Sequence, residues 1–290
     1  MSLPPTNILD HIVHLTPPGS VQEVSQQFRQ LGFNVIPGGT HAGGLTANAL
    51  VILGDDAYLE LIAFTHPASH YPPGSPDAEK RAANPWSHKD PGWIDFAFLG
   101  SSSASIASLI NERGKQDGSG VTYSTEVAGG RVREDGKVLK WVISAPDEKH
   151  GRGALPFFCG DITARKWRVP VDPPSNAQHP SGVLGVAYVR VLVEHASFQS
   201  LAAQLTSVTG NSPVSATSTE SVWELEAPGS TKASYKLVKP RLRLSTPLNE
   251  EEREALQNKG PGIYEVAFRV SEGRKTGEAK TPYGKLVWVS

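Results

Sequence analysis

The feature that most constrains this chain of 290 residues is a short strand-like segment that recurs along it. The segment occurs at residues 9–15, 93–99, 184–189 and 263–269. The first three copies lead into a helical pattern and then into further strand-like runs, which predicts a repeated βαβββ unit. Paired units of this kind curl their sheets into a cup, so the third residue of each copy decides what chemistry the cup can hold. These residues are His11, Asp95, Val186 and Glu265.

Composition excludes several classes of partner. The net charge is −1, with acidic and basic residues interspersed, so no nucleic-acid surface is predicted. Cys159 is the only cysteine, which rules out an internal disulfide and fits a reducing compartment. No apolar run approaches the roughly 20 residues that span a bilayer, and the N-terminus lacks a secretory signal. We therefore expect a cytoplasmic protein, monomer or homodimer, with a small-molecule substrate and neither nucleic acid nor membrane as partner.

The repeats predict an α+β fold of tandem βαβββ modules with curved mixed sheets. Residues 1–170 are expected to form an N-terminal domain of two modules. The connector at 66–92, rich in proline and glycine, lies between these modules and is a candidate lid over a pocket. Residues 171–290 are expected to form a C-terminal domain of one complete and one degenerate module, in which a loop at 271–282 replaces the helix.

A hairpin is predicted over residues 131–141, because Asp135-Gly136 is a strong two-residue turn signal. Arg131 and Arg133 share one face of this hairpin. There they would either bind an anion or remain solvated, and solvated charges are the commoner outcome at such positions.

Four stretches of the first module carry a resemblance to a known family: residues 9–13, 38–41, 46–50 and 58–61. They resemble glyoxalase-like proteins of the vicinal oxygen chelate (glyoxalase/bleomycin resistance/dioxygenase) superfamily, and residues 256–268 resemble the segment before a metal-binding strand in its methylmalonyl-CoA epimerase-like members. The resemblance implies a cup that holds a divalent metal between a His on each first strand and a Glu on each last strand. Members include lyases, isomerases, dioxygenases and metal-free drug-sequestering proteins, so the fold does not fix the reaction.

Strand alternation predicts which side chains meet. Glu60 shares a face with Tyr58 and Ile62, and Asp95 is expected to face the cup together with Trp93 and Ala97, in the register of His11. His11, Glu60 and Asp95 are therefore the predicted catalytic residues and the predicted ligands of one divalent metal, Mn, Fe or Zn. Without metal, the same residues leave a desolvated Glu60 as general base, or simply a His11–Glu60 hydrogen bond in a filled cup.

Other residues are expected to contact substrate in the first cup, although Phe157 stands where the resemblance implies a second Glu. The predicted substrate-binding residues are His41, Asn48, Tyr58, Trp93, Phe157 and His179. In the second cup, Val186 and Lys236 occupy the His and Glu registers. Lys236 is expected to pair with Glu265, which leaves the first cup as the active one.

The predicted function is a glyoxalase-like enzyme, of lyase or isomerase type, that acts on a small carbonyl-containing substrate. Glu60 would abstract a proton or activate water, while His11 and Asp95 bind the metal or polarise an oxygen. The alternative is a metal-free protein of the bleomycin-resistance type that sequesters its ligand.

Overall fold

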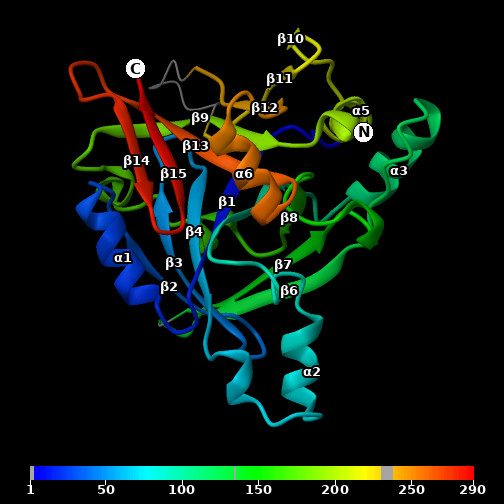
Figure 1. Cartoon of the computed structure of the whole chain (residues 1–290). Coiled ribbons are helices and arrows are strands. Elements are labelled where there is room, and N and C mark those ends of the chain that lie inside the picture. Colours follow the sequence, from blue (N-terminus) through cyan, green and yellow to red (C-terminus); the bar gives the residue numbers. More distant parts are fainter. Residues whose placement is uncertain (1–2, 134, 230–237) are drawn as a thin grey trace.

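The computed structural model describes residues 3–133, 135–229 and 238–290. Its first sheet has eight strands in the order β2-β3-β4-β1-β5-β8-β7-β6 (Figure 1). Module one supplies β1 (Leu9–Thr16), β2 (Ile36–Thr40), β3 (Thr46–Ile52) and β4 (Tyr58–Phe64). Module two supplies β5 (Gly92–Leu99), β6 (Val127–Val132), β7 (Val138–Ser144) and β8 (Phe157–Asp161). The modules join through antiparallel pairing of their first strands, β1 and β5.

The second sheet repeats this plan in the order β10-β11-β12-β9-β13-β15-β14. Module three supplies β9 (Val183–Leu192), β10 (Ser215–Ala216), β11 (Glu220–Glu224) and β12 (Arg241–Ser245). Module four supplies β13 (Gly262–Val270), β14 (Gly277–Thr281) and β15 (Gly284–Val289). β9 and β13 pair antiparallel, as β1 and β5 do. Two pairs of modules therefore build two related sheets.

Helices connect the strands of the first three modules. The α-helices are α1 (Val21–Gln30), α2 (Pro76–Ala83), α3 (Ile106–Gln116), α4 (Arg165–Arg168), α5 (His195–Thr209) and α6 (Glu250–Lys259). Three short 3₁₀ segments are η1 (Ala68–His70), η2 (Glu148–His150) and η3 (Pro174–Ala177). Among the described residues, no helix is both long enough and apolar enough to cross a membrane.

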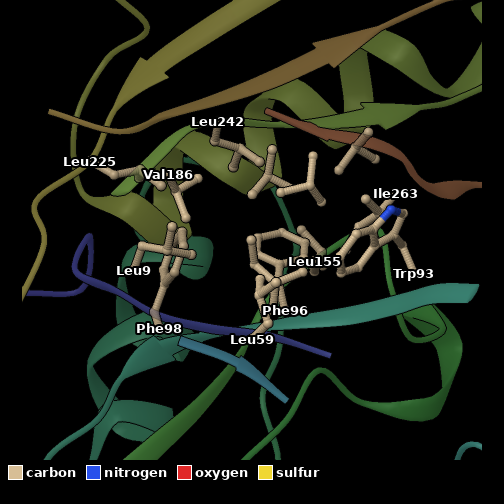
Figure 2. Packing of buried hydrophobic residues seen from close by; sticks show 14 of the residues in the cluster. Leu9, Leu59, Trp93, Phe96, Phe98, Leu155, Val186, Leu225, Leu242 and Ile263 are labelled. Atoms are coloured by element: carbon tan, nitrogen blue, oxygen red, sulfur yellow. The ribbon is translucent and has the colours of Figure 1, made fainter. Parts of the chain in front are cut away.

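The main hydrophobic core lies between the two sheets. Figure 2 shows Leu9, Phe96 and Phe98 of the first sheet facing Val186 and Leu242 of the second. All five side chains are buried. Burial of this shared apolar core stabilises the packing of the two sheets against each other.

The structure confirms the predicted tandem βαβββ architecture and the degenerate fourth module, in which β13 leads to β14 without a helix. The expected loop at 271–282 is wrong in one respect, because β14 lies within it and pairs with β15. The connector at 66–92 contains α2, which the sequence pattern did not predict. The division into two domains at residue 170 falls between the two sheets, and it stays a prediction because one core serves both.

Candidate active site

The first sheet closes on itself around a pocket. Its two edge strands meet where the amide of Ala42 donates to the carbonyl of Gly130 at 2.9 Å and His41 forms a bridge with Arg131. The pocket has a volume of about 440 Å³. Its wall is largely apolar and aromatic, with Trp86, Trp141 and Phe157 among the lining residues. Its polar lining side chains include His11, His41, Asn48, Tyr58, Glu60, Arg131, Arg152 and Arg168.

Asp10 and His11 form a buried pair on β1. The pairing register between β1 and β5 shifts between Leu9 and His11, which marks a bulge at Asp10. Strict alternation would send neighbouring side chains to opposite faces, and a bulge re-aims one of them. The two side chains consequently meet, with 2.7 Å between Asp10 Oδ2 and His11 Nδ1.

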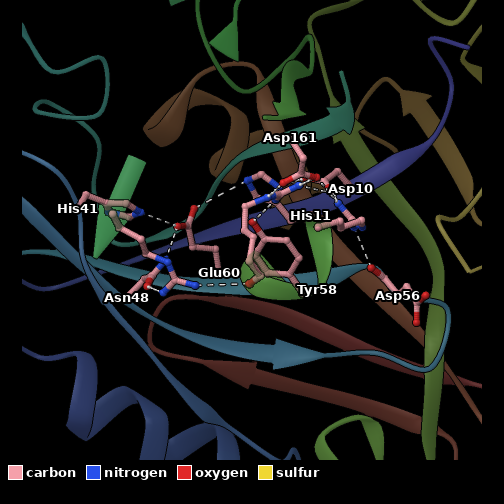
Figure 3. Close-up of polar contacts among 11 residues, drawn as sticks. Asp10, His11, His41, Asn48, Asp56, Tyr58, Glu60 and Asp161 are labelled. Carbon is pink, nitrogen blue, oxygen red and sulfur yellow. Dashed lines mark hydrogen bonds and ion pairs between the residues drawn. The ribbon is translucent and has the colours of Figure 1, made fainter. Parts of the chain in front are cut away.

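Two arginines of α4 determine the charge of Asp10. Burial alone would raise the pKa of this carboxyl, but Arg165 and Arg168, with the hydrogen bond from His11, hold its pKa well below the usual range. Asp10 is therefore ionised and can only accept hydrogen bonds. His11 must then donate from Nδ1, which leaves Nε2 to face the pocket. Figure 3 shows Asp10 and His11 beside Tyr58. The Tyr58 ring stacks on the His11 ring with centroids 4.7 Å apart.

Glu60 lies on β4, two residues beyond the Tyr58 that pairs with His11, and is buried with only 6 % exposure. Asn48 Nδ2 donates to Glu60 Oε1 at 2.6 Å and fixes the carboxylate (Figure 3). His11 Nε2 is 3.8 Å from Glu60 Oε2, and His41 Nε2 is 3.5 Å from Glu60 Oε1. The first of these gaps is too long for a hydrogen bond, yet one oxygen atom could lie about 2.8 Å from both groups.

His41 contributes a second imidazole to the same carboxylate. Its Nδ1 is 2.9 Å from Thr46 Oγ1, so Nε2 is the nitrogen directed at Glu60. Burial lowers the pKa of His41, and nearby Glu60 only partly offsets this. His41 is therefore mainly neutral at pH 7. Cys159 also lines the pocket, but burial raises its pKa to about 12 and keeps the thiol protonated.

Asp95 does not join His11 and Glu60. Its Oδ2 accepts hydrogen bonds from Arg152 Nε at 2.8 Å and from Trp86 Nε1 at 2.9 Å, and Arg152 Nη2 is 2.7 Å away. It lies outside the pocket lining, whereas Arg152 and Trp86 are part of that lining. Within residues 3–133, 135–229 and 238–290, no group of three His, Cys, Asp or Glu side chains is placed to hold a metal ion. The predicted metal set His11, Glu60 and Asp95 therefore does not fit the arrangement.

Two of the predicted substrate contacts, Trp93 and His179, do not line this pocket. Trp93 faces the core between the sheets and donates from Nε1 to the carbonyl of Lys285 at 3.0 Å. The reason is a second register shift, between Val13 and His14 of β1, that places Ile94 on the cup side instead. His179 has a structural role. Its Nδ1 accepts a hydrogen bond from the amide of Asn34, and its Nε2 is hydrogen-bonded to the carbonyl of Ile52. The other predicted contacts, His41, Asn48, Tyr58 and Phe157, line the pocket.

In the second cup, Glu265 lies among several charged and polar side chains. Glu265 accepts from the Tyr188 hydroxyl at 3.0 Å and lies 3.3 Å from Lys285 Nζ. Arg190 pairs with Glu252 at 2.7 Å and is 3.9 Å from Glu265. The expected partner Lys236 lies outside the described residues. Glu265 is therefore engaged by cations other than the one predicted.

Sequence reasoning missed Asp10, Arg168 and Arg152, and it included Trp86 only as part of the candidate lid at 66–92. The adjacent Asp10-His11 pair was a usable signal, but alternation argued against contact between the two. Residues 84–86, at the end of the connector, line the pocket, and Arg81 of α2 lies over the Phe64 ring at 3.3 Å from its centroid. The connector is thus fixed to the sheet at two points.

The paired βαβββ modules and the enclosed cup define a protein of the vicinal oxygen chelate superfamily. More closely, the chain belongs to the family of the glyoxalase-like domain, whose model matches residues 9–209. No curated protein matches the chain.

Two solved structures illustrate the shared fold. A hypothetical protein from Staphylococcus aureus superposes with a TM-score of 0.65 at 10% identity, over 97% of this chain and 98% of its own. A mutant of 4-hydroxymandelate synthase from Streptomyces coelicolor superposes with a TM-score of 0.51 at 14% identity, over 96% of this chain and 78% of its own. At these identities the likeness extends to the fold alone.

Proposed function

We propose that the chain is a glyoxalase-like enzyme that moves a proton beside a carbonyl group of a small organic substrate in the first cup. The observation that carries this proposal is the gap of 3.8 Å between His11 Nε2 and Glu60 Oε2. Both groups are held from behind, by Asp10 and by Asn48, and both face a pocket of small-molecule size. Side chains locked by such supporting bonds are typical of catalytic sites.

Glu60 is the base in this mechanism. Its Oε2 takes the proton from the carbon next to the carbonyl, and the electron pair of the broken C–H bond moves to the carbonyl oxygen. His11, when protonated, donates from Nε2 to that oxygen, and ionised Asp10 stabilises the resulting charge distribution. Return of the proton to a neighbouring carbon is isomerisation, and expulsion of a leaving group is a lyase reaction. We derive no step through a metal, because Asp95 is committed to Arg152.

Hydrogen–deuterium exchange tests this mechanism directly. Proton NMR in D₂O follows exchange at the carbon next to the carbonyl over a panel of small aldehydes, ketones and 2-oxo acids. We expect at least one compound to exchange faster with the protein, and Glu60→Gln to slow that exchange by about 10²- to 10⁴-fold. Glu23→Gln, at an exposed carboxylate of α1, is the matched control and should leave the rate unchanged. Exchange that is as fast in Glu60→Gln as in the wild type would rule out this role.

The aromatic wall favours a second candidate, a protein that only sequesters its ligand. Trp86, Trp141 and Phe157 would provide stacking surface for it. In that case panel compounds bind without exchange, and Glu60→Gln retains their affinity.

A further inference from the structure

Arg131 reaches the pocket from the closure of the first sheet. It lies on edge strand β6, where it bridges to His41, and its side chain is buried with 4 % exposure. Gly38 on β2 leaves the space for it. A Cβ at Gly38 would lie 2.8 Å from Arg131 Nη1 and 2.0 Å from Asn48 Oδ1. A side chain at position 38 would therefore displace both groups.

Arg131 differs from the other arginines of the pocket in its partners. Arg152 pairs with Asp95, and Arg168 pairs with Asp10 and Asp161. Arg131 instead donates to two neutral oxygens, Asn48 Oδ1 at 3.2 Å and the carbonyl of Arg168 at 3.4 Å. Within the described parts of the chain, no carboxylate oxygen lies within 4.0 Å of its guanidinium.

A buried cation without a counter-ion is costly unless a ligand supplies one. Burial lowers the pKa of Arg131, although nearby Tyr58 and Glu60 act against this, and an arginine stays charged at neutral pH. Its hydrogen bonds to Asn48 and to the carbonyl of Arg168 also leave N–H groups free out of the five that a guanidinium carries. Arg131 therefore has both charge and donors available on the pocket side.

Asn48 explains why Arg131 and Glu60 do not neutralise each other. Its Nδ2 donates to Glu60 while its Oδ1 accepts from Arg131. The amide thus stands between the carboxylate and the guanidinium and satisfies each with a neutral partner. Both charges stay available to a bound molecule.

We propose that Arg131 binds the carboxylate of the substrate, so that the pocket takes small carboxylic acids with an aromatic or apolar body. A guanidinium matches a carboxylate with two parallel hydrogen bonds. The acid would lie with its carboxylate at Arg131, its body against Trp86, Trp141 and Phe157, and its reacting carbon towards Glu60. The proposal names the substrate class of the proposed enzyme and rests on that function only for the last of these contacts.

Binding of an unreactive acid and its neutral amide tests the proposal. Isothermal titration calorimetry compares phenylacetate with phenylacetamide, which are similar in shape and differ in charge. We expect the wild type to bind the acid at least about tenfold more tightly than the amide. Arg131→Gln should remove this preference while changing amide affinity by less than about threefold. Arg133→Gln removes the same charge from the same hairpin outside the pocket and should retain the preference.

Several outcomes would overturn the proposal. One is equal binding of acid and amide by the wild type, a measurement that needs no variant and so stands even if Arg131→Gln does not fold. Another is an unchanged acid preference in folded Arg131→Gln, with folding checked by thermal melting. Arg131→Lys keeps the charge but loses the two parallel hydrogen bonds that a guanidinium can make to a carboxylate. It should show an intermediate preference for the acid over the amide. If the acid preference is absent, hydrogen–deuterium exchange that depends on Glu60 can still be observed. If that exchange is absent, the acid preference can still be observed. The two proposals are therefore tested separately.

Discussion

Asp10 and His11 are neighbours in the chain, and their side chains nevertheless form a hydrogen bond of 2.7 Å between Oδ2 and Nδ1. The bulge in β1 makes this possible, and the guanidinium of Arg168 holds Asp10 from the other side, with Nη1 2.8 Å from Oδ2. The pair therefore links the pocket to α4. This makes Asp10 a group whose loss should affect folding as well as catalysis.

Asp10→Asn should lower the free energy of unfolding by about 1.5–3 kcal/mol at pH 7, because the buried Arg168 then keeps only Asp161 as a carboxylate partner. The contribution of Asp10 to the free energy of unfolding depends on pH, because the pKa of Asp10 is lowered in the folded state. Its contribution is complete above the unfolded value of 3.8 and is lost as the pH falls below it towards the folded pKa. Urea unfolding at pH 7 and pH 3 measures both effects. Asp90→Asn, at an exposed site, is the control, and a difference that does not shrink at pH 3 would contradict this account.

His14 is expected to destabilise the folded protein at mildly acidic pH. It is fully buried beside Trp93 and Phe28, and neither ring nitrogen has a hydrogen-bond partner among the described residues. Burial lowers its pKa to about 3, so the unfolded chain takes up the proton first as the pH falls below 6.5. The wild type should lose about 1.4 kcal/mol of stability per pH unit in that window from this group.

His14→Leu removes both the unsatisfied nitrogens and this proton uptake. We expect it to stabilise the protein at pH 7.5, and to stabilise it more at pH 5.0, in urea unfolding. His88→Leu at an exposed position should show no such widening. An equal effect of His14→Leu at the two pH values would mean that His14 takes up its proton as readily in the folded state as in the unfolded chain.

The regular strands of the site are predictable from sequence, and the bulged ones are not. β4 pairs in register with both β1 and β3, so Tyr58, Glu60 and Ile62 all line the pocket as alternation predicts. On β5, the register shift opposite Val13 and His14 breaks that alternation. Trp93 consequently faces the core. A bulge depends on cross-strand pairing, which the local sequence pattern does not encode.

Long-range closure is the other part that sequence patterns do not give. Arg131 lies in the pocket because β6 meets β2, two strands about 90 residues apart in the chain. Arg168 of α4 reaches Asp10 although the two residues lie 158 positions apart in the chain. Residue types and spacing therefore predicted which strands carry the site and left anion binding at Arg131 as one of two outcomes, but they did not indicate Arg152 or Arg168.

Substitution of Asp95 tests whether this residue serves as the ion-pair partner of Arg152 or as the predicted metal ligand. Asp95→Ala should destabilise the protein by about 3–5 kcal/mol, because Arg152 then stays partly buried without its partner. In the double variant Asp95→Ala, Arg152→Ala, the loss should be clearly smaller than the sum of the two single losses. Thermal and urea unfolding of the four proteins gives this coupling energy. Additive losses would show that the ion pair is not what holds Asp95.

Asn48→Ala tests whether the amide keeps Glu60 and Arg131 apart. Without the Asn48 amide, Glu60 and Arg131 are free to pair directly. The affinity for phenylacetate and the rate of hydrogen–deuterium exchange should therefore both fall by about tenfold or more, although neither charged residue has changed. Calorimetry and proton NMR in D₂O measure the two effects. Asn84→Ala removes another pocket-lining amide, which accepts from the Trp86 backbone, and should affect both much less. Folded Asn48→Ala that binds phenylacetate like the wild type would show that Arg131 does not depend on Asn48 to stay unpaired.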